Sequence, residues 1–443
     1  MNKKKNVYSN DTIYVSTGDR TKTIHTKAMY PSKKSSLIVS AALCALTLPF
    51  SPVYSDAIIK TPFGDSTCSN TSTEACIGGS YEDLDSVSIK GYITLSDTFM
   101  PDEKSVFISG FARRDSKFTL NANKSILTTI KPTTAMTNGS SITMNFKDSA
   151  WEGDIVYSDR AYRRGKTSIF TFEGNYEGNS DDDLKGYAFV GTIGAYSGAN
   201  TLNFDGANYK GDVWSNYDDN FGDGGRITIN LKNKSNFEGY MENSGDYFNV
   251  TFTDSTMTGD ITTTNTGSSS TKVPKTKVNF TNSTLNGNLI NTAFFVGTIP
   301  TPEKFGTTAV FNGNGESGYA IIGDISTDVG LMDVTFNQAN MKGNVDIITG
   351  NIDIWTQNNS YSSIITKLTF KNSELDGNII QNIEFTGDDE NKEYSMDYQT
   401  TVTFSGNGTN GYAMKDHSIN LHNTGGVGGK GNISLDKGAK LEN

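Results

Sequence analysis

Histidine, cysteine and proline are scarce in this chain of 443 residues, which has three His, three Cys and nine Pro. So few His and Cys disfavour a zinc cluster of the usual spacing. No His lies between His25 and His417, which disfavours a Ser–His–Asp catalytic triad as well. We therefore expect no bound metal, no cofactor and no enzymatic activity.

Long apolar runs are also lacking, and the mean hydropathy of −0.44 excludes a helical membrane protein. The longest run, from Leu37 to Phe50, follows Lys33 and Lys34 and is about as long as a signal-peptide core. We predict that residues 1–55 are a signal peptide with an extended N-terminal region, and that the mature chain begins at Asp56 or close to it. The protein is then exported through the inner membrane to the cell surface or the extracellular space.

Positive charge is the third shortage. Removing the eight Lys or Arg and two Asp of residues 1–55 from the 38 basic and 49 acidic side chains leaves 30 and 47, a formal net charge of −17. Such a surface repels phosphate backbones, so nucleic acid is not an expected partner. The acidity is spread along the chain, which is typical of a solvated surface.

Two cysteines lie eight positions apart after the signal segment, Cys68 and Cys76. In an exported chain, a close pair in polar surroundings is most simply one disulfide that closes a small loop. We assign this loop to a cap-like segment over residues 56–135, in which no repeat is recognisable.

Glycine, asparagine, threonine and serine are abundant, and from Met136 onward they occur in a repeated phrase such as "FTDSTMTGDI", "FTNSTLNGNL" and "LTFKNSELDGNI". Its recurrence at intervals that average about 29 residues indicates a stacked repeat architecture with loops of variable length. The residues that mark the register are Phe146, Phe172, Phe204, Leu231, Phe252, Phe280, Phe311, Phe336, Phe370 and Phe404.

Within each phrase, apolar and polar residues alternate with a period of two, as in "VTF" at 250–252, which predicts a strand with one buried face. The "NS" or "DS" pair that follows favours a turn, because short polar side chains bond to their own backbone. Next come an apolar residue, a polar residue and a Gly that suits a bend where no side chain is tolerated. A new strand then begins with Asp or Asn followed by Ile, Val or Leu. The bend glycines are Gly153, Gly211, Gly239, Gly259, Gly287, Gly343 and Gly377.

These features predict an all-β protein, a right-handed parallel β-helix (a β-solenoid of the pectin-lyase-like kind) of about ten coils over residues 136–443. No single coil buries its own Phe, so the register-mark residues are expected to stack as an internal ladder. A second phrase, "FNGNGESGYA" at 311–320 and "FSGNGTNGYA" at 404–413, marks either a coil with a different corner or a higher-order repeat.

Two acidic stretches and several tyrosines are the candidate surface features. Asp181–Asp183 and the run containing Asp218, Asp219 and Asp223 lie in the inserts between phrases. The second run resembles a calcium-binding loop, although a solvated loop is the simpler interpretation. The tyrosines in the inserts are suited to stacking on sugars, but ordinary surface positions explain them equally well. They are Tyr157, Tyr162, Tyr217 and Tyr361.

The signal segment, the short Cys loop and the two alternating phrases resemble the passenger domain of an autotransporter, an exported protein of Gram-negative bacteria. The likeness is to the repeat-rich adhesin-like and vacuolating-cytotoxin-like passengers. It implies a non-enzymatic adhesin that binds host-cell glycans or proteins or associates with itself. The alternatives are a carbohydrate-active β-helix enzyme, a polysaccharide lyase or hydrolase, and a vacuolating-toxin-like passenger. Since autotransporters end in outer-membrane strands and this chain stops at "LDKGAKLEN", we expect a truncated piece whose C-terminal translocator is missing; the alternative is a passenger that is exported in another way.

Overall fold

A computed structural model describes most of the chain after residue 116. The described residues are 13–17, 20–24, 57–61, 64–68, 90–96, 117–124, 126–128, 133–136, 141–158, 167–177, 184–216, 224–265, 274–293, 305–328, 330–349, 363–384, 397–424 and 429–442. Side chains are described within these ranges from residue 121 onward, apart from those of 126–128 and 133–136 and those at the ends of several other strands. All regular secondary structure in these residues is β-strand.

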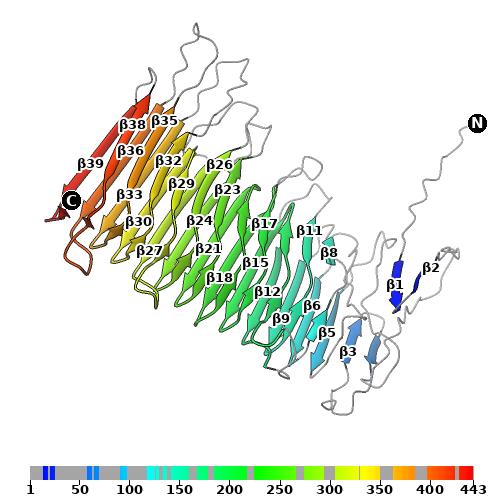
Figure 1. The fold of residues 1–443 in the computed structure, drawn as a ribbon. Coiled ribbons are helices and arrows are strands. Elements are labelled where there is room, and N and C mark those ends of the chain that lie inside the picture. Colours follow the sequence, from blue (N-terminus) through cyan, green and yellow to red (C-terminus); the bar gives the residue numbers. More distant parts are fainter. Residues whose placement is uncertain are drawn as a thin grey trace, which may run out of the picture.

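Three sheets run side by side from β6 to the C-terminal strands, and the chain visits them in turn, so that each circuit forms one coil of a right-handed parallel β-helix (Figure 1). Sheet 1 has 15 strands and contains the long strands. In spatial order it consists of β4 (Gly64–Cys68), β3 (Ala57–Thr61), β5 (Lys90–Ser96), β6 (Lys117–Asn123), β9 (Ser141–Lys147), β12 (Thr167–Glu173), β15 (Ala199–Asp205), β18 (Arg226–Lys232), β21 (Tyr247–Thr253), β24 (Lys275–Thr281), β27 (Gly306–Asn312), β30 (Gly330–Asn337), β33 (Ser363–Lys371), β36 (Asp397–Ser405) and β39 (Gly429–Asp436).

Sheets 2 and 3 are made of shorter strands, 12 and 11 of them. Sheet 2 consists of β7 (Ile126–Thr128), β10 (Ala150–Glu152), β13 (Phe189–Val190), β16 (Tyr209–Lys210), β19 (Asn236–Glu238), β22 (Thr256–Thr258), β25 (Thr284–Asn286), β28 (Ile321–Ile322), β31 (Met341–Lys342), β34 (Leu375–Asp376), β37 (Met414–Lys415) and β40 (Leu441–Glu442). Sheet 3 consists of β8 (Thr133–Met136), β11 (Ile155–Ser158), β14 (Ile193–Ala195), β17 (Val213–Ser215), β20 (Met241–Asn243), β23 (Ile261–Asn265), β26 (Leu289–Ala293), β29 (Ile325–Thr327), β32 (Val345–Thr349), β35 (Ile379–Glu384) and β38 (Ile419–Thr424).

One strand of sheet 2 belongs to each coil, so the described residues contain twelve coils, numbered here from β6–β8 as coil 1 to β39–β40 as coil 12. The stack continues N-terminal to Met136, because β6 pairs in parallel with both β5 and β9. Antiparallel pairing occurs at the N-terminal end, where β3 pairs with β4 and β5, and in a separate hairpin of β1 (Ile13–Thr17) and β2 (Arg20–Ile24). The predicted signal cleavage site lies outside the described residues.

The ten register-mark residues occupy matching positions in sheet 1, each opposite the next, from Phe146 in β9 to Phe404 in β36. All ten are at most 2% exposed. The column continues to Ala122 at one end and to Leu435 at the other. Within β18 the exposure alternates strictly, with Ile227, Ile229 and Leu231 buried, so the period of two decides which face forms the core.

Most of these rings stack on one another. Phe336 lies 5.1 Å from Phe311 and 4.8 Å from Phe370 between ring centroids, with interplanar angles of 12° and 2°. A parallel in-register ladder places equivalent rings about one strand spacing apart, close to 4.8 Å. Offset stacking at this distance adds to the hydrophobic gain from burial. The core is therefore a continuous column that no coil forms alone.

The corner between sheet 1 and sheet 2 is closed by the "NS" and "DS" pairs. Asp254 and Asn282 have φ values of 48°, a left-handed conformation that short polar side chains tolerate. The serine that follows is buried and bonds to two coils: Ser283 Oγ donates to the Thr281 carbonyl at 2.8 Å and accepts from the Ser255 amide at 3.0 Å. These serines thus satisfy backbone groups that the tight corner leaves out of the ladder.

The bend between sheets 2 and 3 is a column of glycines followed by a column of Asp and Asn. The seven glycines singled out in the sequence lie in this column, together with Gly191 and Gly323. After the glycine, an Asp or Asn side chain accepts a hydrogen bond from the backbone of the next coil. Examples are the bond from the Asn344 amide to Asp324 Oδ1 at 2.7 Å and the bond from the Asn378 amide to Asn344 Oδ1 at 3.0 Å.

A polar network also runs inside the helix, between sheets 3 and 1. Its members are buried hydroxyl and amide side chains from coils 4 to 8. They are Ser215, Asn243, Thr263, Thr276, Asn291 and Thr307. Thr263 Oγ1 lies 2.6 Å from Thr276 Oγ1 and 2.7 Å from Thr307 Oγ1, and Thr307 donates to Asn291 Oδ1 at 2.6 Å. Buried polar groups that satisfy one another in this way hold the coils in one register.

Tyr209 in coil 4 is a buried tyrosine whose ionisation should make the stability of the fold depend on pH in the alkaline range. Its hydroxyl lies 2.9 and 2.8 Å from the carbonyl oxygens of Gly191 and Asp212, which share its one proton. Burial, and after it the Asp212 carboxylate, raise the pKa of the Tyr209 phenol well above its ordinary value. The unfolded chain ionises this group near pH 10, so its contribution to stability is complete below about pH 10 and is lost as the pH rises toward the higher folded value.

We expect Tyr209→Phe to be less stable than the wild type by about 0.5–1.5 kcal/mol at neutral pH, because a hydrogen-bonding hydroxyl is lost. Above about pH 10 this difference in stability should shrink. Ionisation of Tyr209 in the unfolded wild type lowers its free energy of unfolding, and the variant has no phenol at this position. Urea unfolding of both proteins between neutral and strongly alkaline pH measures the gap. A constant gap across that range would contradict the prediction.

Candidate functional site

Several candidate residues from the sequence lie outside the described residues or have undescribed side chains. The acidic stretches Asp181–Asp183 and Asp218, Asp219 and Asp223 are outside, as are Cys76, Tyr162, Tyr217 and Tyr361. Cys68 and Tyr157 are described as strand residues without their side chains. The disulfide, the calcium loop and the stacking role of these tyrosines remain predictions.

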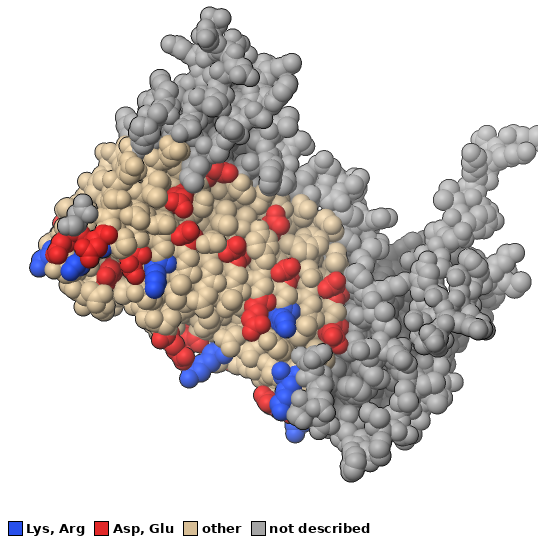
Figure 2. Space-filling model, in the orientation of Figure 1, with Lys and Arg blue, Asp and Glu red and all other residues tan. Residues whose placement is uncertain are grey.

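In the described part of the chain, no group of three or more His, Cys, Asp or Glu side chains is arranged to hold a metal ion. Nor do those residues include a helix with the length and apolar character needed to cross a membrane. Acidic side chains outnumber basic ones on the face seen in Figure 2, and they are scattered along it. The surface features of interest are therefore those that recur from coil to coil.

The second sequence phrase forms a coil with a wider corner between sheets 1 and 2. It occurs in coils 8 and 11, and the stretched version "FEGNYEGNSDDDLKGYAF" occurs in coil 3. Since the intervals are five and three coils, the phrase marks a different corner rather than an even higher-order repeat. Each wide corner ends in a Gly-Tyr-Ala sequence, in which the alanine is buried and the tyrosine is half-buried. The tyrosines are Tyr187, Tyr319 and Tyr412.

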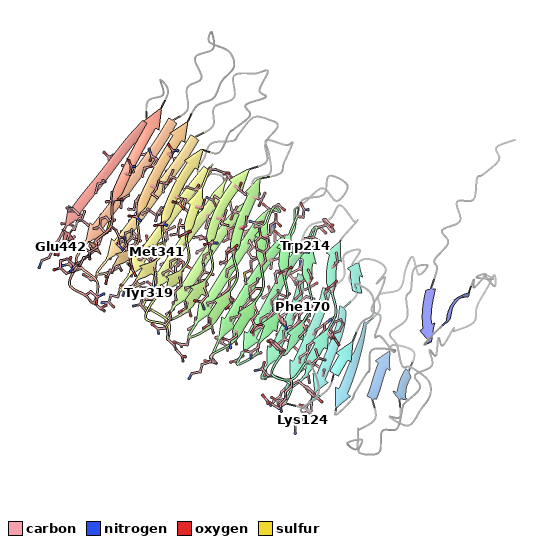
Figure 3. The ribbon with its side chains drawn as sticks, in the orientation of Figure 1. Lys124, Phe170, Trp214, Tyr319, Met341 and Glu442 are labelled. Atoms are coloured by element: carbon pink, nitrogen blue, oxygen red, sulfur yellow. The ribbon has the colours of Figure 1, made fainter. Side chains whose placement is uncertain are left out.

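Each of these tyrosines lies beside a Lys and a carboxylate on the outer surface of sheet 2. We call the three groups the tyrosine clusters: Tyr187 with Lys210 and Glu238, Tyr319 with Lys342 and Asp376, and Tyr412 with Lys415 and Glu442. The Lys and the carboxylate in each cluster are opposite one another on adjacent strands. In Figure 3, Tyr319 and Glu442 lie along the same edge of the stack.

The lysine in each cluster lies over the tyrosine ring. The Nζ atom is 5.6 Å from the ring centroid of Tyr187, 5.9 Å from that of Tyr319 and 5.0 Å from that of Tyr412. These distances are within the range of cation–π attraction, which is worth about 0.5–1 kcal/mol at exposed sites.

The carboxylate fixes the phenol. Tyr187 Oη donates to Glu238, with distances of 3.2 and 3.3 Å to its two carboxylate oxygens, and Tyr319 Oη is 3.5 Å from Asp376 Oδ2. Partial burial, and then the neighbouring carboxylate, raise the pKa of both phenols, whereas at Tyr412 the hydrogen bond to Glu442 is the main cause of a raised pKa. All three phenols therefore stay neutral donors at physiological pH.

The second cluster extends toward the C-terminal coils. His417 Nε2 lies 2.9 Å from Asp376 Oδ1, so this carboxylate contacts both a phenol and an imidazole from different coils. Nearby, Asn410 Nδ2 donates to Glu374 Oε1 at 3.1 Å. Coils 8 to 11 thus share one continuous group of polar side chains around a tyrosine ring.

A second repeated surface is the outer face of sheet 1. The column of residues that precedes the Phe ladder points outward and is mostly Asn and Thr. Neighbouring amides bond along it, as Asn230 Nδ2 does to Asn203 Oδ1 at 2.9 Å and Asn145 Nδ2 to Asn121 Oδ1 at 2.8 Å. This face offers regularly spaced donors and acceptors, without an aromatic ring at each step.

Chemically, each tyrosine cluster supplies an aromatic ring, an ammonium donor and a carboxylate acceptor. Sequence reasoning noticed the Gly-Tyr-Ala phrase but looked for binding tyrosines in the inserts, and so missed the clusters. A usable signal was present: Lys or an acidic residue comes directly before the bend glycine in Lys210, Glu238, Lys342 and Asp376. Those positions point outward on sheet 2, next to the corner.

The class of protein follows from this geometry: a parallel β-helix with recurring polar and aromatic groups on its outer surface. No protein-family model, curated protein or solved structure matches the chain.

Proposed function

We propose that the chain is an exported, non-enzymatic binding protein of the cell surface, of the adhesin-like kind that the autotransporter resemblance implies. The observation that carries the proposal is the recurrence of a half-buried Tyr beside a Lys and a carboxylate at the wide corners of coils 3, 8 and 11. In the first two clusters the Lys comes from the coil after the Tyr, and in the third it comes from the same coil. Binding surfaces built by solenoids use such repetition, because equivalent positions of successive repeats lie along one side. The partners of the protein are host-cell glycans or proteins, or a second copy of the chain on another cell.

The chemistry of the clusters favours binding over catalysis. A glycosidase needs two carboxylates, one as the acid and one as the base or nucleophile, flanking the bond that is cleaved. In each cluster the carboxylate that the phenol contacts lies opposite a lysine on the neighbouring strand. The carboxylate is thus engaged by a phenol, and in the third cluster also by an ion pair between Lys415 and Glu442 at 3.6 Å, which suits the fixed recognition of a polar ligand.

The test uses the full chain, produced with its own N-terminal segment in a Gram-negative host. We expect the chain to be recovered outside the inner membrane and to adhere to cultured epithelial cells in a saturable way. Incubation with plant and microbial polysaccharides should release no new reducing ends beyond those of a boiled control. Retention in the cytosol or sugar cleavage would overturn the proposal, and vacuole formation in the cultured cells would favour the toxin alternative.

A further inference from the structure

We propose that the three tyrosine clusters are glycan-binding subsites that take uncharged sugars and act together on one polysaccharide chain. This inference rests on the proposed binding function and names the residues and the class of ligand. It is independent of the tyrosines in the inserts, which the described residues do not place.

The extra length of the wide corners is not needed for the chain to reach sheet 2. In ordinary coils the sheet 2 residue comes five or six positions after the ladder residue, as Leu375 does after Phe370. In coils 8 and 11 it comes ten positions later, as Ile321 does after Phe311. Both kinds of corner place their residue in the same sheet 2 column. The additional residues form the turn that presents the tyrosine, which points to a role outside the core.

The tyrosine rings are held in place before any ligand arrives. Tyr319 is held by the hydrogen bond to Asp376 and by Lys342 over its ring, and its half-buried ring keeps part of its surface in solvent. A side chain that is already ordered loses little conformational entropy on binding, which increases affinity. Tyrosine combines a large apolar area with few rotatable bonds, and for that reason it is favoured at recognition surfaces.

The groups around each ring match the chemistry of a sugar. The C–H face of a pyranose packs on an aromatic ring, while its hydroxyls accept from the lysine and donate to the carboxylate, in charge-assisted hydrogen bonds. The net charge of the whole chain is −11, and acidic side chains outnumber basic ones on the face seen in Figure 2. Long-range repulsion therefore disfavours sulfated or otherwise polyanionic glycans. Uncharged polysaccharides both pack on the ring with these hydrogen bonds and avoid the repulsion.

The spacing of the clusters favours a polymer. They lie at equivalent corners three and five coils apart, which corresponds to about 14 and 24 Å at a coil spacing of about 4.8 Å. One extended chain reaches neighbouring subsites at such spacings. Linked subsites raise the effective concentration of the second binding event, and avidity then exceeds the affinity of either subsite. A long polysaccharide should therefore bind much more tightly than its short oligosaccharides.

The experiment is affinity electrophoresis of the full chain in gels that contain galactomannan, arabinoxylan or soluble β-glucan, with heparin as the polyanionic comparison. We expect retardation by at least one uncharged polysaccharide and none by heparin. The triple variant Tyr187→Ser, Tyr319→Ser and Tyr412→Ser should weaken binding by about tenfold or more, because the linked subsites are lost together. Tyr247→Ser is the matched control, since Tyr247 is a 38% exposed tyrosine on sheet 1, outside the clusters, and it should bind like the wild type.

A second measurement keeps the test decisive if the triple variant does not fold. In the wild type, bound polysaccharide should protect Tyr187, Tyr319 and Tyr412 from nitration by tetranitromethane, while Tyr247 stays reactive. Equal retardation of the triple variant, absence of protection, or preferential binding to heparin would overturn the inference. Adhesion to cells without glycan binding would also overturn it but leave the proposed function standing, whereas a chain that binds neither cells nor glycans would overturn both.

Discussion

Replacing Gly239 by Ala is expected to destabilise the central coils by about 2–6 kcal/mol. Gly239 has a φ of 146°, which only glycine adopts without strain of about 1–3 kcal/mol. A Cβ at this position would also overlap the backbone carbonyl oxygen of Gly211 in the preceding coil. Because that carbonyl belongs to the stacked bend, it cannot move aside, and overpacking adds about 1–3 kcal/mol. Urea unfolding followed by circular dichroism measures the loss.

The matched control for this substitution is Gly318→Ala. Gly318 has a φ of 81°, but nothing lies within 4 Å of the position that its Cβ would take. The left-handed backbone alone costs about 1–2 kcal/mol, so the control should be clearly more stable than Gly239→Ala. Equal losses at the two positions would show that the contact between stacked bends contributes nothing.

Truncating Phe336 to Ala should cost about 3–5 kcal/mol, the range for a fully buried aromatic residue. Phe336 is 0% exposed and stacks between Phe311 and Phe370, so its removal opens a gap in the ladder and breaks two ring contacts. In a solenoid the loss is concentrated at the neighbouring coils. Hydrogen exchange should therefore accelerate most in β27, β30 and β33, and denaturant unfolding gives the total free energy.

Phe336→Leu provides the comparison, because the chain itself places Leu231 at the equivalent position of coil 5. A leucine fills most of the space, and the expected loss is less than about 1.5 kcal/mol. Tyr247→Ala, at an exposed position of the same sheet, should stay within about 0.5 kcal/mol of the wild type. A Phe336→Ala variant as stable as either of these would contradict the ladder as the source of stability.

The fold class was predictable because its signals are local. The alternation in "VTF", the polar corner and the bend glycine each lie within a few residues of one another, and each restricts the backbone through its own side chains. Even so, the start of the stack could not be recognised. Coil 1 has Ala122 where the following coil has Phe146, so the feature that marks the register is missing there although the strand pairing continues.

The interior polar network was not predictable for a different reason. Thr263, Thr276 and Thr307 come from three separate strands, and in the sequence each is simply one more threonine in a threonine-rich chain. Whether such a hydroxyl points to water or into the core depends on how sheets 3 and 1 meet. That geometry is a property of the stacked coils.

By itself, the sequence determined the unit of this protein: a strand, a corner, a short strand and a glycine bend, with one residue per coil assigned to a common core. The tertiary structure alone decided which surface residues meet. Tyr187 and Glu238 are 51 positions apart and Tyr319 and Asp376 are 57 apart, and each pair is joined across three coils whose loops differ in length. Local side-chain chemistry sets the shape of one coil, whereas contacts between coils follow from the register in which the hydrogen-bonded sheets stack.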